Sequence, residues 1–185
     1  ANIDLKPCKN IGFNIGCNAI VRDWHPDNIS CADRRMVAEV KQSGYKGNLY
    51  TRDNYPKLPY WSLMKEDNPL HWNSGPHAIN IACQQKPDLL FMLGFDLQPG
   101  NIYEDTQNYD VPNPDPKFWI HQLNRMFNTY PDTMFMWVVP QDVANPASWD
   151  TNNLYRSTIK QFPDLKKTLK KGIVDFISMI NESIL

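Results

Sequence analysis

Two short polar segments of the chain have residue types that suit the binding of an anion. Residues 73–76 read Asn-Ser-Gly-Pro at the start of a predicted helix, and residues 94–96 read Gly-Phe-Asp after a very apolar predicted strand. The N–H groups and the positive dipole end of a helix amino terminus favour a phosphate. Gly75 would let such a ligand approach the backbone closely. A purely structural interpretation, an N-cap and a strand end at which Asp96 caps a turn, stays open.

The elements around these segments are expected to alternate between strands and helices. The predicted strands are residues 10–16, 29–32, 48–51, 89–93 and 133–139. Helices are predicted after Asp33, which would serve as an N-cap, then over 74–86, over 115–130 and in a tail over 150–185. Such alternation is typical of a mostly parallel sheet with helices on both faces. We therefore expect one α/β domain over 1–185, a three-layer α/β/α Rossmann-like fold with 29–32, 89–93 and 133–139 in the sheet interior.

The polar residues that follow the strands are expected to gather along one edge of that sheet. Right-handed crossovers place the loops after parallel strands at the same edge, which is where open α/β sheets bind ligands. The candidate ligand-binding residues at this edge are Asn18, Asp33, Asn73, Ser74, Gly75 and Gly94. Asp96 is the carboxylate best placed there, and it is the candidate general base.

Composition excludes several classes of protein. The 185 residues are 42% hydrophobic with a net charge of −1, which fits one globular domain and does not indicate binding to nucleic acid. No apolar run reaches 18 residues, and Ala1 does not open a signal peptide, so neither a membrane span nor export is expected. The four cysteines are far apart and form no CxxC motif. We interpret them as reduced thiols of a cytoplasmic protein. Homo-oligomerisation stays open.

The sequence predicts neither a metal nor another cofactor. The four histidines and the cysteines lack the spacing of a metal site, and there is no Asp-x-Asp motif. The chain also lacks GxSxG and GxxxxGK[ST], which argues against a serine hydrolase of that type and a P-loop NTPase. An aromatic cluster flanks the irregular segment 53–72, and it would either pack that segment down or offer a stacking platform for an acceptor. The cluster comprises Tyr50, Tyr55, Tyr60, Trp61 and Trp72.

Residues 73–97, NSGPHAINIACQQKPDLLFMLGFDL, resemble the central block of the bacterial sialyltransferases of glycosyltransferase family 42 and of related phage and surface-polysaccharide proteins. In that family a Ser-Gly turn opens a helix, and the following strand ends in Gly-hydrophobic-Asp. Gly16-Cys17-Asn18 and the Tyr103 of Tyr-Glu-Asp-Thr extend the similarity over about residues 10–140. The resemblance implies a Rossmann-like sheet that binds a cytidine monophosphate sugar as donor substrate.

The resemblance also implies roles for individual residues. Asn18 would hydrogen-bond the nucleotide, and Ser74 with Gly75 would hold its phosphate or ribose. Tyr103 would donate its hydroxyl to the phosphate, and Asp96 would lie near the sugar. The family's first strand and its Gly-Asn-Gly loop would precede Ala1. The family's general base is a histidine in the loop that here reads NYDVPNPDP, residues 108–116, which contains no histidine.

Two hypotheses about function follow from these observations. In the first, the chain is a glycosyltransferase-like enzyme that transfers a sugar from a nucleotide donor to an unknown acceptor. In the second, it is a non-catalytic binding or structural protein, such as a phage-associated one, that retains the fold without the chemistry.

Overall fold

The protein is an α/β structure with two three-stranded parallel sheets. The computed structural model describes residues 12–56, 72–97, 103–110 and 116–169. The first sheet has the order β1-β2-β3 and the second the order β4-β5-β6. The strands are β1 (Ile15–Cys17), β2 (Asn28–Cys31), β3 (Asn48–Thr51), β4 (Leu89–Leu93), β5 (Met134–Val139) and β6 (Leu154–Thr158). The helices are η2 (Asn18–Arg22), α1 (Arg34–Gln42), α2 (Ser74–Cys83), α3 (Pro116–Thr129) and α4 (Phe162–Leu169).

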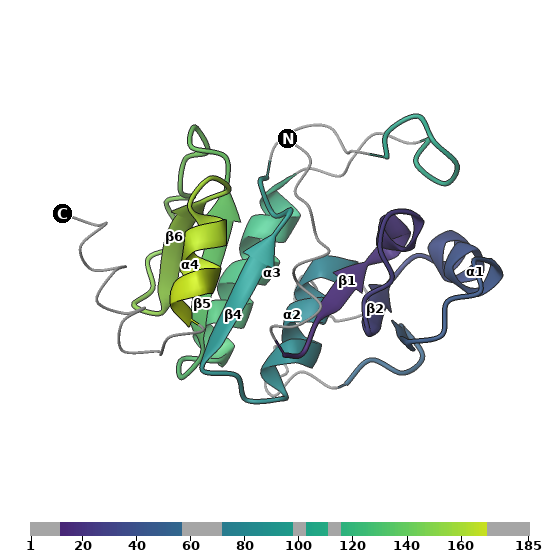
Figure 1. Cartoon of the computed structure of the whole chain (residues 1–185), viewed down its shortest axis with the longest axis horizontal. Helices are drawn as coiled ribbons and strands as arrows, with labels where there is room; N and C mark the ends of the chain where they lie inside the picture. Colours follow the sequence, from purple (N-terminus) through teal and green to yellow (C-terminus); the bar gives the residue numbers. More distant parts are fainter. Residues whose placement is uncertain (1–11, 57–71, 98–102, 111–115, 170–185) are drawn as a thin grey trace.

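The parallel α/β architecture confirms the prediction from the sequence, but the described residues form two separate sheets instead of one continuous sheet. β2 and β5 are the central strands, as expected, whereas β4 lies at an edge of its sheet. β4 was expected in the interior because its side chains are all apolar. Figure 1 shows β1 and β4 as the two inner strands, which run in the same direction with α2 behind them. The chain adds β2 and β3 on one side of β1, returns through α2, and adds β5 and β6 on the far side of β4.

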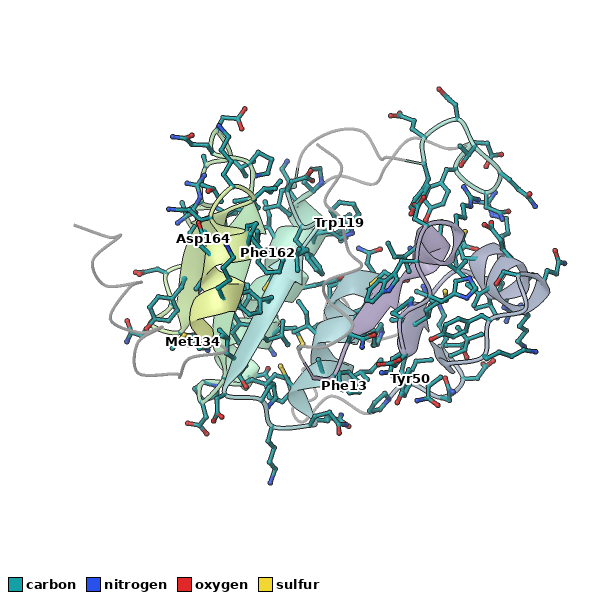
Figure 2. The ribbon with its side chains drawn as sticks, in the orientation of Figure 1. Phe13, Tyr50, Trp119, Met134, Phe162 and Asp164 are labelled. Atoms are coloured by element: carbon teal, nitrogen blue, oxygen red, sulfur yellow. The ribbon has the colours of Figure 1, made fainter. Side chains whose placement is uncertain are left out.

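Helices pack on both faces of each sheet because alternate side chains of a strand point to opposite faces. In β2, Ser30 points to α2, whereas Ile29 and Cys31 pack in a cluster with residues of η2 and α1. In β5, Trp137 and its alternate neighbours pack on α3, whereas Met136 packs on α4 with Phe162. Phe162 meets the ring of Phe91 edge-on, with centroids 5.3 Å apart, and lies over the second sheet in Figure 2.

The predicted helix starts are accurate where a local capping interaction defines them. The Asp33 carboxylate accepts a hydrogen bond of 2.7 Å from the Arg35 N–H, so Asp33 is the N-cap of α1 as predicted. The helical tail predicted over 150–185 is wrong at its start, because β6 occupies Leu154–Thr158. β6 was missed because its strand identity comes from pairing with β5 and its residues are largely polar. α4 follows it, and residues 170–185 lie outside the described part of the chain.

β6 begins at a polar junction with the end of α3. The side-chain amide of Asn153 lies 3.1 Å from the Phe127 carbonyl, 3.0 Å from the Tyr130 carbonyl and 3.1 Å from the Thr133 carbonyl. The last turn of a helix leaves carbonyl groups without partners inside the helix. The two amide hydrogens of Asn153 are shared among these three carbonyls, of which that of Phe127 belongs to the last turn of α3, and they fix the helix end beside the edge strand.

We predict that Asn153→Ala lowers the free energy of unfolding by about 1–3 kcal/mol, because partly buried carbonyl groups lose their donor. The neighbouring residue provides a matched control, since Asn152 is exposed. Asn152→Ala should change the stability by no more than about 0.5 kcal/mol. Urea denaturation of the two variants measures the difference, and equal effects would show that the junction contributes nothing specific.

Candidate functional site

The first turn of α2 is attached to the carboxyl ends of β1 and β2 through Ser74. Its hydroxyl donates to the Asn18 side-chain oxygen at 2.7 Å and accepts from the Ala32 N–H at 2.8 Å. The Ser30 hydroxyl donates in turn to the Ser74 carbonyl at 2.9 Å. Ser74 is only 4% exposed, so these bonds are made away from bulk water. The predicted site residues Asn18 and Ser74 therefore touch directly, and Asp33 follows Ala32 at the same edge.

Both inner strands end in a residue with a left-handed backbone. Asn18, directly after β1, has a φ of 52°, and Gly94, directly after β4, has a φ of 78°. Left-handed backbone is costly for most residues but accessible to glycine and, less readily, to asparagine. Burial of the Cys31 thiol, which packs in the same cluster as Ala19, raises its pKa to about 12. The turn after β1 is held in place through the Asn18 side chain, which accepts from Ser74.

Phe95 covers Gly75 at the start of α2. A Cβ placed on Gly75 would lie 2.7 Å from Cε1 of Phe95, which is closer than a carbon–carbon contact allows. The Phe95 carbonyl accepts a hydrogen bond of 2.8 Å from the Trp137 indole, which anchors the loop after β4. The position at which the sequence predicts a ligand is thus taken by an aromatic ring. This packing brings Gly94 and Asp96, the neighbours of Phe95, to the amino end of α2.

Asn73 joins α2 to α3 and makes no side-chain cap. Its backbone N–H donates to the Gln122 side-chain oxygen at 3.1 Å, and its amide nitrogen lies 3.4 Å from the same atom. Asn73 therefore fixes the entry to the helix rather than satisfying the N–H groups of its first turn.

Tyr103 lies over η2, and its hydroxyl donates to the Asp23 carboxylate at 2.5 Å. The Arg22 guanidinium lies 5.3 Å from the centre of the Tyr103 ring. Arg22 also holds the segment 103–110 through hydrogen bonds. Arg22 donates to Glu39 at 2.5 and 2.9 Å, to the Thr106 hydroxyl at 2.6 Å and to the Gln107 carbonyl at 2.7 Å. The hydrogen bonds from Arg22 hold the pKa of the Glu39 carboxyl below its ordinary value.

Two tyrosines that the sequence did not assign to the site pack near Asn18 and Ser74. The Tyr55 hydroxyl is 3.0 Å from the Ser30 hydroxyl, and its ring stacks on His77 with centroids 3.7 Å apart. Tyr109 packs against the cluster that contains Ala19, and burial raises the pKa of its hydroxyl. Tyr55 belonged to the aromatic cluster, and its stacking favours the packing interpretation of that residue. No local pattern distinguishes Tyr109.

Arg52 is a cation at the same edge that the sequence did not single out as a site residue. Its Nε donates to the Ala32 carbonyl at 2.7 Å, while the Ala32 N–H bonds to Ser74. The guanidinium is therefore linked through Ala32 to Ser74, the first residue of α2. The amino end of a helix is the positive end of its dipole.

The described residues contain no group of histidine, cysteine or acidic side chains arranged to hold a metal ion. Cys17, Cys31 and Cys83 are free thiols, as expected, and Cys8 lies outside the described part of the chain. Tyr60 and Trp61 also lie outside it. Within the residues described, no helix is both long and apolar enough to cross a membrane.

Searches of protein-family models, curated proteins and solved structures found no match to this chain.

We predict that Gly75→Ala destabilises the parent protein but stabilises the Phe95→Ala variant. In the parent protein the added methyl group collides with Phe95, and overpacking should cost about 1–3 kcal/mol of unfolding free energy. In a Phe95→Ala background the collision is absent, and alanine should stabilise the helix by up to about 1 kcal/mol relative to glycine. Thermal and urea unfolding of the four proteins measure this. An identical effect in both backgrounds would mean that Phe95 does not pack on Gly75.

Proposed function

We propose that the chain binds a nucleotide or nucleotide sugar at the edge where β1 and β4 end and α2 begins, and that it acts as a glycosyltransferase-like protein. One observation carries this proposal. β1 and β4 are the inner strands, and the strand order reverses between them. Each is followed by a residue with left-handed backbone, Asn18 after β1 and Gly94 after β4. Both strand ends contact the first turn of α2. In open α/β folds, ligands bind at the carboxyl edge where the order reverses. Strained backbone such as that of Asn18 is concentrated at functional sites.

The charge at this edge suits a phosphate group. Arg52 provides a full positive charge, and the α2 dipole adds partial positive charge. The Asn18 side chain uses its oxygen to accept from Ser74, so the amide hydrogens are the groups with which it would donate to a ligand. A guanidinium with amide donors is a combination that recognises phosphate oxygens. The resemblance to glycosyltransferase family 42 supports a nucleotide sugar as the source of that phosphate.

The proposed transfer moves the sugar from the nucleotide to an acceptor hydroxyl. The acceptor oxygen bonds to the anomeric carbon as the bond from that carbon to the phosphate oxygen breaks, and the nucleoside phosphate leaves. Asp96 is the proposed base that takes the acceptor proton. Tyr109 is the proposed donor to the leaving phosphate, because a tyrosine hydroxyl is protonated at neutral pH and Tyr109 packs beside Ala19, the residue that follows Asn18.

A second candidate, a binding protein without catalysis, is favoured by the packing around α2. The Ser74 hydroxyl already donates and accepts within the protein, and Phe95 occupies the space above Gly75. These two residues would then stabilise the edge without touching a ligand. Ligand binding with no release of sugar from any nucleotide sugar would distinguish this candidate from the enzyme.

We predict that Asn18→Asp weakens the binding of nucleoside phosphates tenfold or more while leaving thermal stability close to that of the parent. Aspartate tolerates left-handed backbone and can still accept the hydrogen bond from Ser74. It places a negative charge where the phosphate is proposed to bind, and a repulsion of about 1.4 kcal/mol corresponds to tenfold in affinity. Calorimetric titration with a panel of nucleotides and nucleotide sugars gives the affinities.

Asn152→Asp is the matched control for this measurement. Asn152 is exposed and precedes β6, so the same charge change is made at the opposite edge of the second sheet. The control should bind as tightly as the parent. Failure of the parent to bind any member of the panel, or equal affinities of the two variants, would contradict the proposed site.

A further inference from the structure

Phe118, in the first turn of α3, holds an aromatic ring largely in solvent. It is 59% exposed, and Phe13, at 45%, is the other exposed large hydrophobic side chain among the described residues. A single exposed apolar side chain needs no explanation by itself. The position of Phe118 relative to α2 is what distinguishes it from Phe13.

α2 and α3 pack against each other, and two contacts fix how far each helix extends along the other. At the start of α2, the Asn73 N–H donates to the Gln122 side chain. Further along, the Tyr130 hydroxyl, directly after α3, donates to the Asn80 side chain of α2. The contacts follow in the same order and at similar spacing along both helices. The helices are therefore parallel, and Gln122 is level with the start of α2.

Phe118 lies one helical turn before Gln122 on the same flank of α3. Residues four apart in an α-helix share a face, and this is the flank that contacts Asn73. One turn advances about 5.4 Å along the axis, and each Cα–Cβ bond tilts toward the amino end of the helix. The ring of Phe118 therefore lies beyond the level at which α2 begins, on the flank of α3 that faces α2.

The proposed phosphate site lies at the start of the same helix. Ser74, the first residue of α2, bonds to the Asn18 side chain and to the Ala32 N–H. The Ala32 carbonyl accepts in turn from Arg52, so the amide and the cation of the proposed site are both linked to this helix end. In a nucleotide the ribose separates the base from the phosphate. A phosphate held here can place its base about one helical turn further along α3, which is where Phe118 lies.

A phenylalanine ring in this position suits a nucleobase. Every base has a flat π-face that stacks on an aromatic side chain, whichever base it is. Phenylalanine has no polar atom in its side chain, so it adds no hydrogen bond that would distinguish one base from another. The ring and the cationic edge together suit a nucleotide better than a phosphate without a base.

We propose that Phe118 stacks on the base of the nucleotide whose phosphate binds at the amino end of α2. The assignment rests on the proposed function and adds to it the residue that binds the base. It also makes the contribution of Phe118 to affinity similar for every base.

Titration of Phe118→Ala with two kinds of ligand, one of which lacks the base, tests this assignment. Phe118→Ala should weaken the binding of nucleoside 5′-monophosphates about tenfold or more, because the stacking contact is lost. It should leave the affinity for ribose 5-phosphate unchanged, and Phe118→Trp should retain the affinity for the nucleotides. NMR titration measures both affinities, and the base protons should shift upfield on binding to the parent but not to Phe118→Ala.

Phe13→Ala is the matched control, because it removes the same side chain from an exposed position. Phe13 precedes β1 and therefore lies at the amino ends of the strands, and Figure 2 shows it at the opposite end of the molecule from Trp119, the neighbour of Phe118. Phe13→Ala should bind both ligands as the parent does.

Two results would overturn the role of Phe118 without touching the phosphate site. They are an unchanged affinity of Phe118→Ala for nucleoside monophosphates, and an equal loss of affinity for the nucleotides and for ribose 5-phosphate. A parent protein that binds neither ligand would contradict the proposed function as well, so the two proposals fail distinguishably.

Discussion

The buried hydroxyl of Ser74 is the contact on which the arrangement of the sheets depends. It donates to Asn18 after β1 and accepts from Ala32 after β2, so one side chain ties a helix to the ends of two strands. The same helix carries Ile79 and Cys83 into the core around Met92 of the second sheet. The position of β4 relative to β1 is therefore set through α2. The geometry of any ligand site at this edge therefore depends on the attachment of α2 to β1 and β2.

Arg22 provides the second constraint, because it holds a segment that is distant in sequence. Its guanidinium pairs with Glu39 of α1 and donates to residues of the segment 103–110. This places Tyr109 against the cluster that contains Ala19, the residue after Asn18. A tyrosine that is assigned a ligand contact must be held in this way, since a mobile hydroxyl loses orientation and affinity. Arg22 thus holds the segment that carries Tyr109, to which the proposed function assigns the contact with the leaving phosphate.

Features that depend on neighbours in sequence could be predicted, and features that depend on distant partners could not. The start of α1 followed from Asp33, because capping is local. The start of α2 at Ser74 was also predicted, although neither Asn73 nor Ser74 caps that helix with its side chain. β6 and the edge position of β4 depend on pairing between strands that are far apart in the chain. The contact of Phe95 with Gly75 was missed for the same reason, although each residue had been noticed separately. The gathering of Asn18 and Ser74 was predicted correctly because parallel strands end at a common edge.

Several residues that the sequence assigned to a ligand site bond within the protein instead. Ser74 and Gly75 have roles inside the protein, Tyr103 bonds to Asp23, and Asp33 caps a helix. Arg52 and Tyr109 add a cation and a hydroxyl that the sequence comparison did not assign. The proposed function therefore depends less on Ser74 as a ligand group than on Asn18, which Ser74 orients.

A double-mutant cycle between Asn18 and Ser74 tests the central claim most directly. Asn18→Gly keeps the left-handed backbone while removing the amide, and Ser74→Ala removes the hydroxyl. If the bond between them holds α2 to β1, the unfolding free energies from urea denaturation should be non-additive, with a coupling of about 1 kcal/mol or more. Losses that add to within about 0.3–0.5 kcal/mol would contradict the account, because the two side chains would then stabilise the protein independently.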